Sequence, residues 1–182
     1  PDMVFCANQS FPFINQNHEP QVILSKMASE YRQGEVEHIA KWYENNGYHL
    51  IRQIYPPVEV EGMVDAIWHP SKKVLYIRYG FRTSKNALQR AADCISCDVI
   101  GLELVLPHFY HLDTALSVIN ETTAIFVKEA FSKSGREILE HMFPNLIEVP
   151  LNEAKFGFVT NGHCPDKRNF IVHKGNHITK QK

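Results

Sequence analysis

The sequence has no long apolar run and almost no net charge, and each absence excludes a class of protein. Its 182 residues include 19 basic and 20 acidic side chains, so the formal net charge is -1. A nearly neutral chain carries no electrostatic signature for binding nucleic acid. There is also no stretch of 18 apolar residues that could span a bilayer. We therefore expect neither nucleic acid nor a membrane as a partner.

Cysteine is also scarce, with only Cys6, Cys94, Cys97 and Cys164 in the chain. This is too few for a secreted disulfide scaffold, so a reducing, cytoplasmic setting is the simpler expectation. Cys94 and Cys97 have the spacing of a redox or zinc motif, but no second pair supplies the remaining ligands. We expect two partly buried thiols and no metal site there. A metal or redox module that includes His108 is the alternative.

What is present is the composition of a folded domain, 44% hydrophobic and 21% charged, arranged in a repeated pattern. Three apolar runs, at 22–24, 74–77 and 124–127, start 52 and 50 residues apart. After each run come a polar connector, an amphipathic helix, a second short apolar strand and a proline. The expected helices cover 34–46, 85–97 and 134–142, and the expected closing strands cover 48–54, 99–106 and 146–149, ended by Pro56, Pro107 and Pro150.

A further strand precedes each apolar run and is joined to it by a hairpin. These strands are expected at 2–7, 65–68 and 114–118, and segments 156–160 and 170–172 would open a fourth unit. The chain is then an α/β protein built from strand, strand, helix, strand modules. We expect one domain over 1–182, with modules at approximately 1–60, 61–110 and 111–155 and a partial module at 156–182.

An array of such modules has to close on itself, because a terminal unit otherwise exposes a sheet edge and an apolar face. Neither end of this chain resembles a polar cap, and it starts at Pro1, inside an expected strand, without an initiator Met. We therefore expect an α/β-propeller that is incomplete and truncated at both ends. A complete small α/β domain with ordinary termini is the alternative.

The most informative polar residues lie at the entry to the first strand of each unit. They are Asp2 and Asn8 in the first unit, Glu61 and Asp65 in the second, and His111 and Asp113 in the third. In a pseudo-symmetric array, equivalent positions face the same axis, so we expect these side chains to share one pocket. Carboxylates beside an amide and an imidazole suit a planar cation with several donors, such as guanidinium.

Five segments, in this order, resemble the guanidine-modifying enzyme superfamily of arginine deiminases, dimethylarginine dimethylaminohydrolases and amidinotransferases. They are Val4–Asn8, Arg32–Glu35, Glu61–Asp65, Gly80–Thr83 and Phe109–Thr114. The resemblance covers nearly the whole chain and is greatest to the bacterial arginine-dihydrolase-like branch. It implies the α/β-propeller called the pentein fold, a small guanidino substrate and no cofactor, and it is compatible with a homo-oligomer.

In this family a cysteine thiolate attacks the guanidinium carbon and forms a covalent amidino intermediate. Water resolves the intermediate in hydrolases, and a second amine resolves it in amidinotransferases. The resemblance implies that His111 is the general acid and base, and that Glu61 and Asp113 hold the guanidinium nitrogens. The residues it assigns to substrate binding are Asn8, Arg82 on the α-carboxylate, and Asp65 as a residue that orients its neighbours.

The nucleophile is expected near the family's C-terminus, farther beyond His111 than the 71 residues that follow it here. Cys164 lies in an expected hairpin turn and is not expected to take that role. We therefore expect this chain alone to be inactive and the complete protein to be a hydrolase of arginine or a substituted arginine. Ala28 and Val64 replace an arginine and a glycine of the family pattern, which favours a substituted guanidine or a non-catalytic guanidine-binding protein. An amidinotransferase, with the same first half-reaction, is the other alternative.

Overall fold

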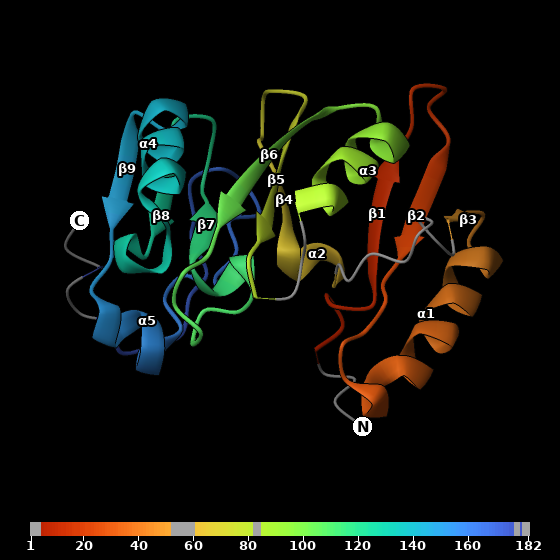
Figure 1. Cartoon of the computed structure of the whole chain (residues 1–182), viewed down its shortest axis with the longest axis horizontal. Helices are drawn as coiled ribbons and strands as arrows, with labels where there is room; N and C mark the ends of the chain where they lie inside the picture. The colour runs from red at the N-terminus through yellow and green to blue at the C-terminus, as the bar shows by residue number, and fades with distance from the viewer. Residues whose placement is uncertain (1–4, 52–60, 82–84, 177–178, 180–182) are drawn as a thin grey trace.

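The computed structural model describes residues 5–51, 61–81, 85–176 and 179 of the chain. Within these residues the chain is an α/β protein whose sheets follow one another along its long axis (Figure 1). The sheet orders are β1-β2-β3, β4-β5-β6 and β7-β8-β9. In each sheet the first two strands are antiparallel and the last two are parallel. This is the strand, strand, helix, strand order that the repeated apolar runs predicted.

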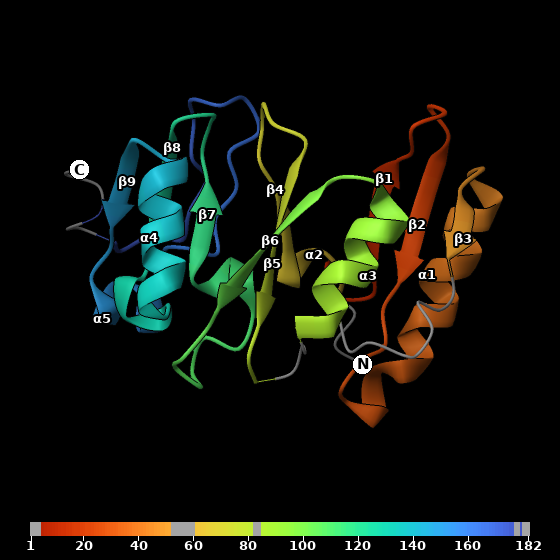
Figure 2. The same ribbon diagram turned by 45° about the horizontal axis from the view of Figure 1, so that its top comes forward.

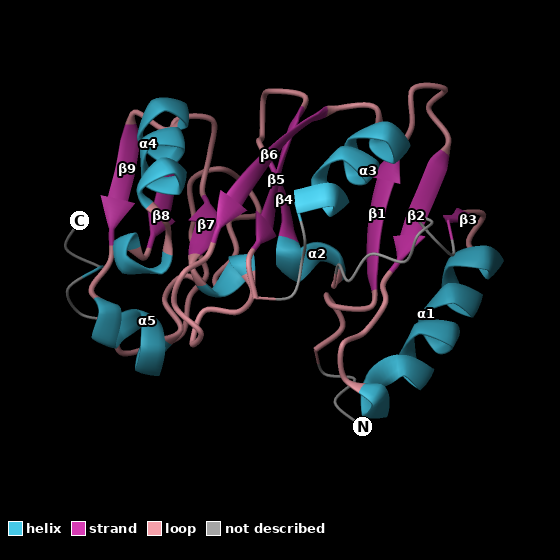
Figure 3. Ribbon diagram, in the orientation of Figure 1, coloured by secondary structure: helices cyan, strands magenta, loops and turns pink. Residues whose placement is uncertain are grey.

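Figure 3 shows the strands and helices by type. The strands are β1 (Ser10–Ile14), β2 (Pro20–Leu24), β3 (His49–Ile51), β4 (Ala66–Trp68), β5 (Val74–Tyr79), β6 (Asp98–Glu103), β7 (Leu116–Val118), β8 (Thr123–Phe126) and β9 (Asn145–Glu148). The helices are α1 (Gln33–Asn45), α2 (Gly62–Asp65), α3 (Lys85–Ile95), α4 (Lys133–Met142) and α5 (Leu151–Gly157), with 3-10 turns η1 (Glu30–Arg32), η2 (Leu112–Thr114) and η3 (Lys128–Ala130).

The long helices connect the parallel strands, because a parallel pair needs a crossover and cannot be closed by a tight turn. Figure 2 shows α1, α3 and α4 spread along the row of sheets, one helix to each. Their observed ends differ from the expected ends by at most two residues. The start of α4 has a clear local cause, since the Ser132 side chain accepts a hydrogen bond from the Gly135 N–H at 3.3 Å.

Buried apolar side chains join each unit to the next one. Phe11 and Phe13 of β1 pack with Leu75 and Ile77 of β5 in a core shared by the first two units. A larger core joins Tyr76 and other residues of the second sheet to the third unit. Because the units are fixed against one another in this way, the segments that enter their first strands are held close together.

The expected first strand at 2–7 differs from the structure, in which β1 begins only at Ser10. Residues 1–4 lie outside the described residues, and residues 6–9 form turns and bends. The Phe5 carbonyl accepts hydrogen bonds from the side chains of Gln9 and Arg32, at 3.1 Å and 2.9 Å. Elsewhere in the segment, the Ala7 and Gln9 carbonyl oxygens accept from the backbone N–H groups of Met63 and Ser25, so its carbonyl groups have scattered partners and form no regular ladder.

The expected strand at 156–160 is also wrong, because α5 occupies 151–157. Pro150, read as the end of a strand, lies at the N-cap of this helix, where its fixed φ of -63° is suitable. Segment 170–172 forms no strand either, and only an isolated bridge joins Ile171 to His163. In the first unit, β3 ends at Ile51, and the rest of the expected strand, with Pro56, lies outside the described residues.

Candidate functional site

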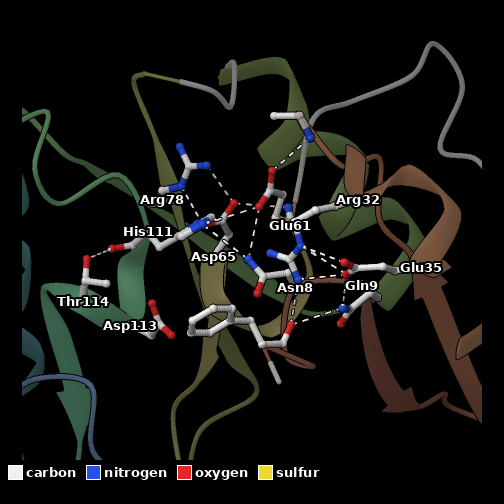
Figure 4. A network of polar contacts seen from close by, with 12 residues as sticks. Asn8, Gln9, Arg32, Glu35, Glu61, Asp65, Arg78, His111, Asp113 and Thr114 are labelled. Carbon is white, nitrogen blue, oxygen red and sulfur yellow. Dashed lines mark hydrogen bonds and ion pairs between the residues drawn. The ribbon is translucent and has the colours of Figure 1, made fainter. Parts of the chain in front are cut away.

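Polar side chains from three separate segments meet at one place, as Figure 4 shows. Asn8 comes from the loop before β1, Glu61 lies directly before α2, and His111 lies directly before η2. The Asn8 Nδ2 donates to the Glu61 Oε2 at 3.2 Å and lies 3.4 Å from the His111 Nε2. The His111 Nε2 is also 3.4 Å from the Glu61 Oε2. These three residues are buried, and we call them the Asn8–Glu61–His111 cluster.

Glu61 is fixed through both its side chain and its backbone. Its Oε1 accepts a hydrogen bond from the Ala28 N–H at 3.0 Å, and its own N–H donates to the Asp65 Oδ2 at 3.1 Å. The carboxylate therefore joins the segment after β2 to the start of the second unit. Its Oε2 is left in the cluster, facing Asn8 and His111.

Gly62 allows the loop that carries Asn8 to approach Glu61 closely. Gly62 has a φ of +55°, and a Cβ at this position would lie 2.4 Å from the Ser10 carbonyl oxygen and 2.6 Å from that of Ala7. The same Ala7 oxygen accepts a hydrogen bond from the Met63 N–H at 2.9 Å. Only glycine fits this space and this conformation, which explains why glycine follows Glu61 in the sequence.

The Asn8 loop is also held from the side of α1. The Gln9 Nε2 donates to the Glu35 Oε2 at 2.7 Å, and the Arg32 guanidinium forms an ion pair with the same carboxylate at 3.0 Å. Both Gln9 and Arg32 also donate to the Phe5 carbonyl oxygen. Arg32 and Glu35 thus hold the loop in place through Phe5 and Gln9. These contacts fix the orientation of the neighbouring Asn8.

Asp65 lies beneath the cluster and connects His111 to a buried arginine. Its Oδ1 is 2.8 Å from the His111 Nδ1, and it binds Arg78 through two hydrogen bonds of 2.7 Å and 2.8 Å. Burial alone would raise the pKa of Asp65, but the hydrogen bonds from His111 and Arg78 and their charges lower it below its usual value. Asp65 is completely buried and Arg78 nearly so.

Asp113 has a hydrogen-bond donor on only one of its two carboxylate oxygens among the described residues. Its Oδ2 accepts a hydrogen bond from the Asn161 Nδ2 at 2.8 Å, while its Oδ1 is buried and has no hydrogen-bond partner among the described residues. Burial raises the pKa of Asp113 to about 6, and the charge of Asp65 adds to this rise while that of His111 opposes it. A buried carboxylate oxygen without a donor is costly unless a cation binds there.

Replacing Asp113 with asparagine should therefore stabilise the protein when no ligand is bound. With a folded-state pKa of about 6 and an ordinary value of 3.8, the carboxyl is protonated in both states below about pH 3 and ionised in both well above pH 6. The cost of its burial thus grows as the pH rises through this interval. We expect Asp113→Asn to raise the free energy of unfolding by about 1–3 kcal/mol at pH 8.

Urea unfolding of the wild type and the variant at two pH values checks this expectation. The gain should shrink towards zero at about pH 3, where the wild-type carboxyl is protonated in the folded and unfolded protein alike. An equal gain at both pH values would instead mean that the ionisation of Asp113 is not its cause.

The expected site residues fall into two groups. Asn8, Glu61 and His111 contact one another directly, with Asp65 bonded to His111 and Asp113 two residues farther along the chain. Asp2 and Arg82 lie outside the described residues. Asp65 was expected among the substrate-binding residues, but both its oxygens are occupied by protein donors and its side chain has no exposed surface. It can orient its neighbours but has no free position for a ligand.

Sequence reasoning missed three residues that hold the site residues or their loop in place through hydrogen bonds. Arg78 directly follows the apolar run at 74–77 and was given no role, although an arginine that continues a buried strand was itself a signal that a buried acid lay nearby. Asn161, which holds Asp113, gave no signal because it lies in a segment that was expected to be a hairpin tip. Gln9 also gave none, since its role depends on a contact with Glu35, 26 residues away.

Other groups considered in the sequence lie elsewhere. The cysteines within the described residues are unpaired, and burial raises the pKa of both Cys94 and Cys97. In the part of the chain that is described, no group of three or more His, Cys, Asp or Glu side chains has a metal-binding arrangement. No helix there is long and apolar enough to cross a bilayer. The contacts of the His111 ring among these residues include no cysteine.

This arrangement can carry out acid–base chemistry on a bound cation. The His111 Nε2 lies 3.4 Å from the fixed carboxylate of Glu61. The carboxylate of Asp113, two residues after His111, interacts with the charge of His111 and has an unsatisfied oxygen. A planar cation with several N–H donors could pair with such carboxylates, and the imidazole could exchange a proton with it.

Comparison with known proteins gave relatives that act on arginine or its derivatives. No protein-family model matches the chain. It is 36% identical over 154 residues to N(G),N(G)-dimethylarginine dimethylaminohydrolase of Mycobacterium tuberculosis, covering 85% of this chain and 48% of that protein. It is 29% identical over 144 residues to the bifunctional arginine dihydrolase/ornithine cyclodeaminase ArgZ of Synechocystis, covering 79% of this chain and 20% of that protein.

Solved structures agree with these relatives. The product-bound N-terminal domain of the cyanobacterial arginine dihydrolase ArgZ superimposes with a TM-score of 0.88 at 26% identity, over 100% of this chain and 64% of that one. The chain spans about half the length of the first curated relatives that it matches.

Proposed function

This chain belongs to the guanidine-modifying enzyme superfamily, in its arginine-dihydrolase-like branch, and we propose that the complete protein hydrolyses a C–N bond of a guanidino substrate. The observation that carries this proposal is the buried Asn8–Glu61–His111 cluster, with the unpartnered oxygen of Asp113 in the next turn of chain. Arginine and substituted arginines are the substrate class, since the relatives named above act on dimethylarginine and arginine.

The guanidinium is held by carboxylates on two different units. Glu61 offers its Oε2, and Asp113 offers the oxygen that has no protein donor. Guanidinium is planar and presents its N–H groups in pairs, so two carboxylates at fixed positions can define both its place and its plane. Asn8 completes the polar wall with an amide, and Arg82 binds the α-carboxylate of the substrate.

His111 transfers the protons of the reaction. In the first step a cysteine thiolate outside this chain attacks the guanidinium carbon, and the C–N bond to the leaving amine breaks as that amine takes a proton from His111. In the second step His111 removes a proton from water, which attacks the amidino carbon and releases the thiolate with a ureido product. Asp65 does not touch the substrate in this scheme and instead orients His111.

The α/β-propeller architecture is part of the same proposal. Each described unit has the same strand order, and each packs on the next one through a shared apolar core. Further modules of the complete protein would close this row into a ring and bring the cysteine to the axis. In that arrangement the present chain alone is inactive.

Substrate turnover by the complete protein tests the proposal. Incubation with arginine and with N-methylated arginines should release ammonia or an alkylamine and form a ureido product, measured by mass spectrometry. Acid-quenched samples should contain a protein species heavier by one amidino-linked fragment. Transfer of the amidino group to an added amine would identify an amidinotransferase, and binding without turnover would identify a non-catalytic protein. Either result contradicts the hydrolase.

A further inference from the structure

Arg78 is a charged residue in the middle of β5, and it is almost completely buried, at 1% exposure. Its Nε and Nη2 donate to the two oxygens of Asp65, at 2.7 Å and 2.8 Å. A buried guanidinium is tolerated only when it is paired and hydrogen-bonded in this way. Two paired hydrogen bonds also fix the plane of the carboxylate, because both partners are flat.

Asp65 has two further contacts, one with the Glu61 N–H and one with the His111 Nδ1. Its Oδ1 lies 2.8 Å from the His111 Nδ1, and its Oδ2 accepts a hydrogen bond from the Glu61 N–H at 3.1 Å. An ionised carboxylate can only accept, so a neutral His111 must carry its hydrogen on Nδ1. In this neutral form Nε2 accepts from the Asn8 amide nitrogen 3.4 Å away, and the Glu61 Oε2 at the same distance pairs with Nε2 when the ring is protonated to donate.

We propose that Arg78 is a positioning residue that acts through Asp65: it keeps this carboxylate ionised and oriented, so that His111 holds its hydrogen on Nδ1 and presents Nε2 to the cluster. The proposal rests on the function proposed above, in which Nε2 exchanges the protons of the reaction. Arg78 itself touches neither the substrate nor the reacting atoms.

The charges around His111 explain why this support is needed. Glu61, Asp65 and Asp113 are acids in its surroundings, with the neutral Asn8 and Tyr110 beside the ring. Among the described residues, Arg78 is the cation that pairs with these acids at Asp65. Without it, the rise in the pKa of Asp65 that burial causes would be opposed by His111 alone. A protonated carboxyl would donate to the His111 Nδ1 and move the ring hydrogen to Nε2, the wrong position for a base.

Nitrogen-15 NMR of the histidine rings in the complete protein tests this proposal with Arg78→Met. We expect the wild-type His111 to show the Nδ1–H form and the variant to show the Nε2–H form. The variant kcat should fall by a factor of about 10 to 10⁴, while KM changes by less than about threefold. An Nδ1–H form that persists in folded Arg78→Met would overturn the proposal.

Two further variants separate this role from a general loss of structure. Arg78→Lys keeps the charge and one donor, so it should retain the Nδ1–H form and recover part of kcat. Lys128→Met removes a cation from the ion pair between Lys128 and Glu148, in which His111 takes no part, and should leave the ring form of His111 unchanged.

A measurement on the wild type keeps the proposal testable if Arg78→Met does not fold. The carbon-13 signal of the Asp65 carboxyl should stay in its ionised position down to about pH 5, whereas a carboxyl that is protonated there contradicts the role of Arg78. These measurements also distinguish a failure of this proposal from a failure of the proposed hydrolase function. A wild type that shows the Nδ1–H form but turns over no guanidino substrate would contradict the hydrolase and leave the part played by Arg78 intact.

Discussion

Replacing His111 with alanine should lower the kcat of the complete protein by a factor of roughly 10²–10⁴, the usual contribution of a general acid and base. The His111 ring is the proton-exchanging group nearest to Glu61 and Asn8, and Asp65 fixes its orientation from the far side. Without the ring, neither the leaving amine nor the attacking water has a proton partner. Steady-state kinetics with the substrate that is turned over fastest measures the effect.

His108 provides a matched control, because it lies three residues before His111 but is exposed and contacts only the edge of Phe109 among the described aromatic rings. We expect His108→Ala to keep kcat within about twofold of the wild type. Cys164→Ser should also remain active, since the nucleophile is expected elsewhere. If Cys164→Ser is inactive while His111→Ala retains turnover, the assignment of the site is wrong.

Gly62→Ala should destabilise the protein by about 2–5 kcal/mol, because it combines a strained backbone with overpacking. An alanine there would need a left-handed conformation, which costs about 1–2 kcal/mol by itself. Its Cβ would also meet three backbone carbonyl oxygens within 2.9 Å, and backbone atoms cannot turn away as a side chain can. Denaturant unfolding of the variant measures the loss.

The same substitution should also damage the site, because the carbonyl groups that it displaces belong to Ala7, Asn8 and Ser10. Two other glycines separate the causes. Gly47 has a φ of +80° and open space around it, so Gly47→Ala should cost only the conformational part, about 1–2 kcal/mol. Gly34 lies in α1 with no atom near its Cβ position, so Gly34→Ala should be neutral or gain up to about 1 kcal/mol. Equal losses at all three positions would contradict the close-approach argument.

The regular part of the fold could be predicted because its signals are local. Apolar residues at helical spacing and short apolar runs define α1, α3, α4 and the central strands, since each element buries one face whatever its neighbours are. The failures at 2–7 and 156–160 have a different origin. There the backbone conformation depends on distant partners, such as the Arg32 side chain that binds the Phe5 carbonyl group, or on a proline that can end a strand or begin a helix.

The candidate site divides in the same way. The motif residues Asn8, Glu61 and His111 were predicted to meet, and they lie in contact. Their supports were not predicted, because Arg78, Gln9 and Asn161 take their roles from partners far away in the sequence. The unpartnered oxygen of Asp113 likewise cannot be seen in a sequence, since it depends on which donors reach that position.

The sequence by itself determined the repeated unit, the α/β class and the residue types at the entry to each first strand. These depend on periodicity and composition, which the chain carries locally. Only the tertiary structure decided that Asp65 faces Arg78 and His111, and that one oxygen of Asp113 is left without a donor among the described residues. Packing of one unit on the next sets those distances, and a hydrogen bond forms or fails within less than an ångström.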